Sequence, residues 1–127
     1  MKPLFIPETP KTPLVNCNCE LGMIELSGMS YSEDTFAFYE PVFLWLNKYA
    51  LQPHEETNFN MKIKYFNTGA VKCLFDILEI FSKLSQQGNK VNVNWFYDVN
   101  DKELLASGED YSAMLGYPFN MIEEKQF

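Results

Sequence analysis

Two segments of the chain alternate apolar and polar residues, and this pattern predicts two strands. Every second residue from Phe59 to Tyr65 is apolar, and the residues between them are polar. The segment from Val91 to Tyr97 repeats the pattern, with asparagines at the first two intervening positions. Successive side chains of a strand point to opposite faces, so one face of each strand should be buried and the other polar. The sheet is therefore expected to carry its helices mainly on one side.

The segment between these strands, from Gly69 to Gln87, is predicted to form the strongest helix of the chain. Its apolar residues recur at intervals of three and four positions, as on one face of a helix. The residues expected to face the sheet are Val71, Leu74, Phe75, Leu78 and Phe81. Oppositely charged residues four positions apart follow the outward face, where each pair adds only a few tenths of a kcal/mol. Gly88 is placed to end the helix.

Another helix is predicted from Glu33 to Leu51, where apolar residues again recur at helical spacing. Ser32 and Asp34 are available to cap its first turn. Pro41 lacks a backbone donor and crowds the preceding turn. We therefore expect either a kink or a short turn before a main helix that begins near Glu40.

The carboxyl-terminal part is predicted to contain a helix from Asp101 to Leu115 and a final strand from Phe119 to Glu123. Gly108 lies in the middle of this helix, where glycine costs roughly 1 kcal/mol relative to alanine. Pro118 separates the helix from the strand.

The amino-terminal segment 1–13 is predicted to be an extended arm, because four of the seven prolines of the chain lie within it. An edge strand is expected near Phe5 and Ile6. Two short apolar runs follow, at residues 14–19 and 23–27, and the sequence Glu-Leu-Gly at 20–22 separates them. This arrangement is typical of a β-hairpin.

Together these elements predict the α/β class: one small domain over residues 1–127, with a mixed sheet and helices mainly on one face. A chain of 127 residues with 46% hydrophobic content is long enough for one ordinary core and too short for two. The architecture alone does not identify a function.

Charge and composition narrow the classes of partner. The net charge of -7 opposes binding to phosphate backbones, so nucleic acid is not expected as a partner. No apolar run approaches the roughly 20 residues that span a bilayer, and prolines interrupt the amino-terminal segment where a signal peptide would be apolar. We expect a cytoplasmic protein without membrane contact, whose three cysteines are reduced thiols.

Candidates for catalysis and metal binding are few. A nucleophile such as Thr68 or Cys73 needs an adjacent base, and the single histidine, His54, lies in an acidic loop typical of a solvated surface. Cys17 and Cys19 with His54 do not have the spacing of a structural zinc site, so no metal or other cofactor is expected. The remaining carboxylate candidates are interpreted as exposed charges on the last helix: Glu103, Glu109 and Asp110.

Thr68 is the residue with two competing interpretations. It follows a strand and precedes the strongest helix, so its hydroxyl is predicted to cap the helix by accepting a bond from a first-turn amide. The same hydroxyl, exposed at the positive end of a helix, is also placed to accept a phosphoryl group. Gly69 would keep the first turn accessible, and Lys72 one turn later could approach the phosphate. Asn67 is interpreted as a turn-forming residue that helps to present Thr68.

Two segments carry a resemblance to a known family. Residues 64–72 (KYFNTGAVK) continue through 76–77 to 86–88, and residues 91–98 (VNVNWFYD) follow. Weaker similarity covers Ile6, Thr9, residues 12–13 and residues 28–33. In these segments the chain resembles the SiaC family of bacterial regulatory phosphoproteins. Ser32 stands where that family often has proline.

The resemblance implies a STAS-like fold, similar to that of anti-sigma-factor antagonists, and a phosphorylation site at Thr68. It implies a partner Ser/Thr kinase, a PP2C-like phosphatase, and an unphosphorylated form that binds an effector such as a diguanylate cyclase. Tyr31 and Glu33 could belong to a docking surface, although a loop at the entry to a helix is the simpler interpretation. Two other function classes stay open at this point. They are a small α/β enzyme with Thr68 or Cys73 as nucleophile, and a binding module that is not phosphorylated.

Overall fold

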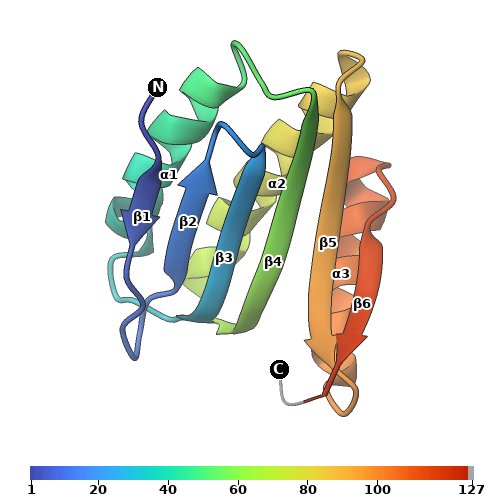
Figure 1. The fold of residues 1–127 in the computed structure, drawn as a ribbon. Coiled ribbons are helices and arrows are strands. Elements are labelled where there is room, and N and C mark those ends of the chain that lie inside the picture. The colour runs from blue at the N-terminus through green and yellow to red at the C-terminus, as the bar shows by residue number, and fades with distance from the viewer. Residues whose placement is uncertain (126–127) are drawn as a thin grey trace.

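The computed structural model describes residues 1–125, and these residues form one mixed sheet covered by helices on one face (Figure 1). The strands are β1 (Leu4–Ile6), β2 (Leu14–Asn18), β3 (Met23–Ser30), β4 (Glu56–Phe66), β5 (Lys90–Asp98) and β6 (Asn120–Glu124). The helices are α1 (Thr35–Tyr49), α2 (Thr68–Gln86) and α3 (Lys102–Leu115). The predicted α/β class, mixed sheet and one-sided helices are confirmed.

The strands lie side by side in the order of the sequence, from β1 to β6. β1, β2 and β3 pair antiparallel, and β3, β4, β5 and β6 pair parallel. Each helix connects two neighbouring parallel strands, so the carboxyl ends of β3, β4 and β5 lie at the same edge as the starts of α1, α2 and α3. We call this edge the carboxyl edge of the sheet.

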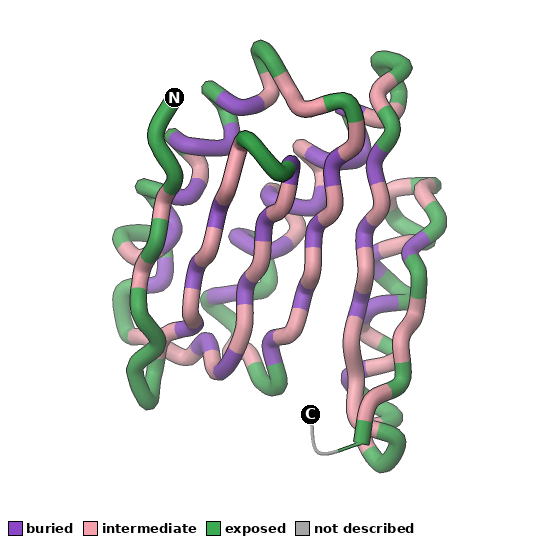
Figure 2. The backbone as a smooth tube through the Cα atoms, in the orientation of Figure 1, coloured by how far each residue is buried: buried purple, intermediate pink, exposed green. Residues whose placement is uncertain are grey.

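The core lies between the sheet and the helices. Buried and half-buried residues alternate along β2, β3, β4 and β5, as the predicted alternation requires (Figure 2). Phe59 on β4 is fully buried and stacks on Phe81 of α2, with 4.5 Å between ring centroids. This contact fixes α2 on the centre of the sheet.

Asparagine side chains link neighbouring strands on the open face of the sheet. Asn92 donates a hydrogen bond to Asn58 Oδ1 at 3.0 Å, and Asn94 donates to Asn60 Oδ1 at 2.9 Å. Asn120 extends the row by donating to Asn94 Oδ1 at 2.9 Å. These amide side chains hydrogen-bond to one another across β4, β5 and β6. The bonds explain why asparagines occupy the open face of these strands.

Most predicted elements are confirmed within one or two residues at their ends, including the β-hairpin and the edge strand at Phe5 and Ile6. Asp34 caps α1 as predicted, with its Oδ1 accepting from Ala37 N at 3.2 Å. The alternative of a separate turn before Glu40 is wrong, because α1 runs through Pro41 as one helix.

The predicted burial of Tyr65 is wrong, because β4 contains a bulge. Gly28 pairs with Ile63 whereas Met29 pairs with Tyr65, so Lys64 is an extra residue in β4. An extra residue moves every later side chain to the other face. Tyr65 is therefore 52% exposed, and Phe66 packs against the core in its place.

Val71 was also expected to face the sheet, and it is instead 43% exposed. The buried stripe of α2 begins at Ala70 and continues through Cys73 and Leu74, so Val71 lies at its margin.

Within residues 1–125, no helix combines the length and the apolar character needed to cross a bilayer.

Gly108 allows α3 to approach the sheet closely. A Cβ atom at this position would lie 2.6 Å from Cδ1 and Nε1 of Trp95. Trp95 is buried, and its Nε1 donates to Leu104 O at 3.0 Å, so the ring has no room to move. The glycine that weakens the helix by sequence propensity is therefore required by packing.

Gly108→Ala is expected to destabilise the protein, even though alanine is the better helix former. Overpacking typically costs about 1–3 kcal/mol, which exceeds the roughly 1 kcal/mol gained in helix propensity. Urea unfolding followed by circular dichroism measures the difference. The neighbouring exposed change Glu109→Ala serves as a control and should lie within about 0.5 kcal/mol of the wild type. A Gly108→Ala protein more stable than the wild type would contradict the packing argument.

Candidate functional site

Thr68 lies at the carboxyl edge, as the first residue of α2 and two residues after the end of β4. Its side chain is exposed, and no hydrogen bond to it is found within the described residues. The hydroxyl is thus available to an external group. No acidic residue lies in the first turn of α2, so no carboxylate of that turn opposes an anion there.

Asn67, and not Thr68, is the cap of α2, which corrects the sequence-based expectation. The backbone of Asn67 is extended, with φ −82° and ψ 175°, and its Oδ1 accepts a bond from Ala70 N at 3.1 Å. Asparagine and threonine are both competent caps, and α2 begins at Thr68, one residue before the helix predicted from Gly69. The consequence is that the Thr68 hydroxyl takes no part in holding the helix.

Gly69 lies where the starts of α1 and α2 approach each other. A Cβ atom at Gly69 would lie 3.0 Å from Thr35 Oγ1 and 3.6 Å from Asn67 Oδ1. A larger residue would press against the first turn of α1. Gly69 therefore combines an accessible first turn of α2 with close packing of the two helix starts.

Lys72 is exposed and lies one turn after Thr68, but its ammonium group is engaged elsewhere. Nζ lies 2.9 Å from Asp76 Oδ1 and 5.3 Å from the ring centroid of Phe75. The hydrogen bond that Lys72 donates to the Asp76 carboxylate raises the pKa of its ammonium group. The side chain therefore extends toward the following turn and not toward the Thr68 hydroxyl.

The loop that joins β3 to α1 carries Tyr31 and Glu33, and it lies against the start of α2. Asn67 donates from its backbone N to Ser30 O at 3.0 Å, and from Nδ2 to Ser32 O at 3.3 Å. The structure thus brings this loop, residues 31–34, to the cap residue that precedes Thr68. Glu33 is exposed on the loop.

Tyr65 is a surface residue of this region that the sequence pattern did not reveal. Its ring meets the ring of Tyr31 edge-on, with 6.1 Å between centroids. Tyr31 also donates from its backbone N to Lys11 O at 2.9 Å, so the amino-terminal arm reaches the same edge. The bulge at Lys64 turns Tyr65 outward, and no feature of the apolar alternation signals it.

The alternative nucleophile Cys73 is buried, and the alternative base His54 lies apart from this site. Cys73 is buried on α2, and burial raises the pKa of its thiol, which opposes formation of a thiolate. Burial likewise raises the pKa of Cys17 to about 12. His54 precedes β4, at the edge opposite the carboxyl edge, and its Nδ1 lies 3.1 Å from Glu56 O.

The carboxylates Glu103, Glu109 and Asp110 are all exposed on α3. Within residues 1–125, no three histidine, cysteine, aspartate or glutamate side chains are grouped so that they could hold a metal ion.

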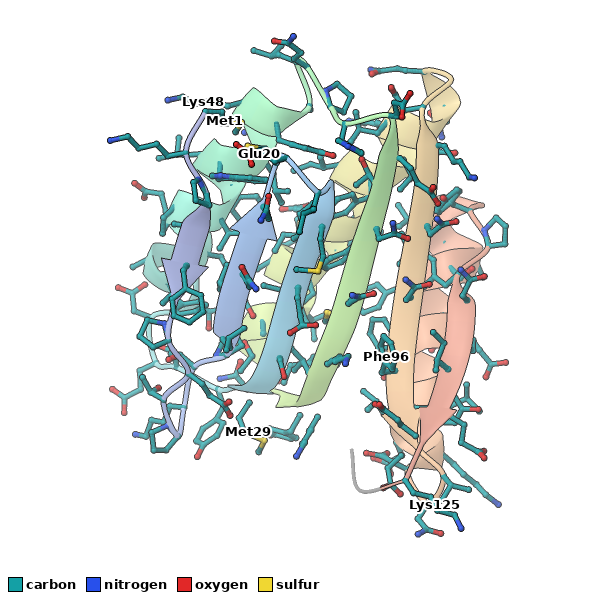
Figure 3. The ribbon with its side chains drawn as sticks, in the orientation of Figure 1. Met1, Glu20, Met29, Lys48, Phe96 and Lys125 are labelled. Atoms are coloured by element: carbon teal, nitrogen blue, oxygen red, sulfur yellow. The ribbon has the colours of Figure 1, made fainter. Side chains whose placement is uncertain are left out.

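A hollow of about 900 Å³ also lies away from Thr68. It is lined by residues of the amino-terminal arm, by Glu20, and by Trp45 and Lys48 of α1. In Figure 3, Met1, Glu20 and Lys48 gather at the end of the molecule opposite Met29, which lies near the carboxyl edge. The Thr68 region is therefore a surface of loops and helix starts, not part of this hollow.

Comparisons with known proteins agree on one family. The sequence profile of the SiaC family regulatory phosphoprotein matches residues 6–124. An uncharacterized protein of Pseudomonas aeruginosa (strain UCBPP-PA14) is 25% identical over 119 residues, which cover 94% of each chain.

Solved structures show the same fold. SiaC of Pseudomonas aeruginosa is 25% identical, with a TM-score of 0.85 and coverage of 99% of this chain and 100% of that one. The crystal structure of diguanylate cyclase SiaD in complex with its activator SiaC, from the same organism, contains a chain that matches with a TM-score of 0.89. That chain is 24% identical, and the match covers 95% of this chain and 99% of that one. Because the family profile spans almost the whole sequence, this chain belongs to the SiaC family of regulatory phosphoproteins.

Proposed function

We propose that this protein is a phospho-switch whose switch residue is Thr68. A Ser/Thr kinase adds the phosphate, a PP2C-like phosphatase removes it, and the unphosphorylated form binds an effector of the diguanylate cyclase class. The observation that carries the proposal is the exposed Thr68 hydroxyl on the first residue of α2, which Asn67 frees from the capping role. Family membership supports reversible phosphorylation, and the SiaD–SiaC complex supports the class of effector.

The proposed switch transfers one phosphoryl group to Thr68 and later removes it. The Thr68 oxygen attacks the γ-phosphorus of ATP, the bond from that phosphorus to the bridging oxygen breaks, and ADP leaves. The hydroxyl proton passes to a base of the kinase. In the phosphatase, water later cleaves the phosphoester. This reaction restores the Thr68 hydroxyl and releases inorganic phosphate. Because ATP is the donor, we place this switch in the cytoplasm.

The start of α2 is suited to hold the product. A helix start presents backbone N–H groups without helical partners, and the helix dipole favours negative charge by about 0.3–1 kcal/mol. The phosphate adds about −1.5 to −2 charge at pH 7 and strong acceptor oxygens. Binding, and not catalysis, is the proposed activity of the chain. The raised pKa of the Cys73 thiol and the distant His54 support this assignment.

Incubation with the kinase and ATP is expected to add one phosphate, and Thr68→Ala should abolish the addition. The substitution should cost no more than about 0.5 kcal/mol of stability, since Thr68 is exposed and does not cap α2. Intact-mass spectrometry and peptide mapping measure incorporation, and circular dichroism melts measure the fold. Thr9→Ala on the exposed arm is the matched control. Undiminished phosphate on the Thr68→Ala protein would refute the assignment.

A further inference from the structure

Asn67 joins the start of α2 to loop 31–34. Its Oδ1 accepts from Ala70 N at 3.1 Å, which holds the helix. Its Nδ2 donates to Ser32 O at 3.3 Å, which holds the loop. One amide side chain therefore makes two bonds of opposite sense, one to each segment.

The Ser32 carbonyl is a junction between the two helix starts. It also accepts a bond from Thr35 Oγ1 at 3.2 Å, and Ser32 Oγ accepts from Asp34 N at 3.2 Å. Before the loop, Ser30 Oγ and Tyr39 OH share a buried hydrogen bond of 2.7 Å. The loop is thus held at its two ends by β3 and α1, and the Asn67 amide links it to the start of α2.

A phosphate on Thr68 would compete for this amide. Asn67 is the adjacent residue, and its Nδ2 group is a donor, which a phosphate oxygen can accept. Hydrogen bonds to a charged acceptor are roughly twice as strong as bonds between neutral groups. The phosphate is also an acceptor for the first-turn N–H groups that Asn67 Oδ1 now shares. Both effects favour a new orientation of the Asn67 amide once Thr68 is modified.

We propose that Asn67 is a positioning residue that transmits the phosphorylation state of Thr68 to loop 31–34. Phosphorylation draws the Asn67 amide toward the phosphate and breaks its bond to Ser32 O, which keeps its bond from Thr35 Oγ1. The loop that carries Tyr31 and Glu33 then changes conformation. The inference rests on the proposed function of Thr68 and adds a route by which the surface around it responds. The Tyr31–Tyr65 ring pair lies on that surface, so an effector that docks there would also sense the modification through the loop.

The test compares Asn67→Ser with the wild type, each made with threonine or with phosphothreonine at position 68. Serine keeps an acceptor for the helix cap, but it is too short to supply the amide that donates to Ser32 O. Asp101→Ser is the matched control, because Asp101 Oδ1 caps α3 in the same way, accepting from Leu104 N at 3.0 Å. Incorporation of phosphothreonine during translation removes any dependence on a kinase.

Backbone ¹H–¹⁵N spectra report the loop directly. Phosphothreonine should shift the signals of residues 31–34 in the wild type and in Asp101→Ser. Asn67→Ser should show displaced loop signals already without phosphate and little further change with it. If Asn67 only capped α2, Asn67→Ser would change the α2 signals equally with threonine and with phosphothreonine at position 68. The signals of residues 31–34 would then still shift on phosphorylation.

Two outcomes would overturn the inference. One is a phosphorylated wild type whose loop signals are unchanged, and the other is an Asn67→Ser protein whose loop responds as fully as the wild type. Neither result bears on whether a kinase modifies Thr68, which the incorporation experiment decides separately.

Discussion

Phosphorylation of Thr68 is expected to weaken binding to the effector by a hundredfold or more while leaving the domain folded. The fold should tolerate the phosphate because the start of α2 favours negative charge and carries no acidic residue in its first turn. A partner that docks over this surface must instead remove water from the phosphate. A buried charge without a partner costs about 3–5 kcal/mol, and each 1.4 kcal/mol is about tenfold in affinity.

Titration calorimetry measures the affinity of the unmodified, phosphorylated and Thr68→Ala proteins for a diguanylate cyclase from the organism that makes this protein. Thr68→Ala should bind as the unmodified protein does. Thr68→Glu should imitate the phosphate only in part, because one carboxylate carries less charge and fewer acceptor oxygens. Equal affinity of the unmodified and phosphorylated forms would end the release mechanism, and tighter binding of the phosphorylated form would reverse its sign.

The apolar periodicity predicted the strands and helices that bury a continuous face. It did not predict which of two apolar residues is buried where they are adjacent in the sequence. Tyr65 and Phe66 are adjacent, so either can point to the core at the end of β4. The bulge at Lys64 selects Phe66, through the pairing of β4 with β3. That pairing joins residues far apart in the sequence, and a local pattern does not contain it.

The capping residue shows how far local propensity resolves a site. Asn67 and Thr68 are neighbours with similar capping preference, so the sequence located the helix start to within one residue but not its cap. The difference decides the chemistry, since a hydroxyl that held the helix would be less available to a kinase. The position of the helix start was predicted from the sequence, whereas its hydrogen bonding was not.

Contacts between distant segments account for the rest. The bond from Asn67 to Ser32 joins residues 35 positions apart, and the packing of Gly108 on Trp95 joins α3 to β5. Tyr31 was a docking candidate within the segment that resembles the SiaC family, and its ring partner Tyr65 was expected in the core. Sequence reasoning therefore found one half of this surface pair.

Phe59→Ala is expected to be among the most destabilising substitutions, at about 3–5 kcal/mol, because it removes a fully buried ring and leaves a cavity. The loss is a large share of the roughly 5–15 kcal/mol that stabilises a domain. Phe59 is stacked on Phe81, so the two residues should be coupled in a double-mutant cycle of Phe59→Ala and Phe81→Ala. The losses of stability in the two single variants should not add up to the loss in the double variant. Urea unfolding measures the stability of each variant, with Phe5→Ala on the exposed edge strand as the control.

Phe59 lies on the core side of β4, away from the carboxyl edge, so Phe59→Ala protein that remains folded should keep its affinity for the effector. A loss below about 1 kcal/mol would show that the stack does not hold α2 on the sheet. Weakened binding by fully folded protein would show that stability and docking are coupled through β4.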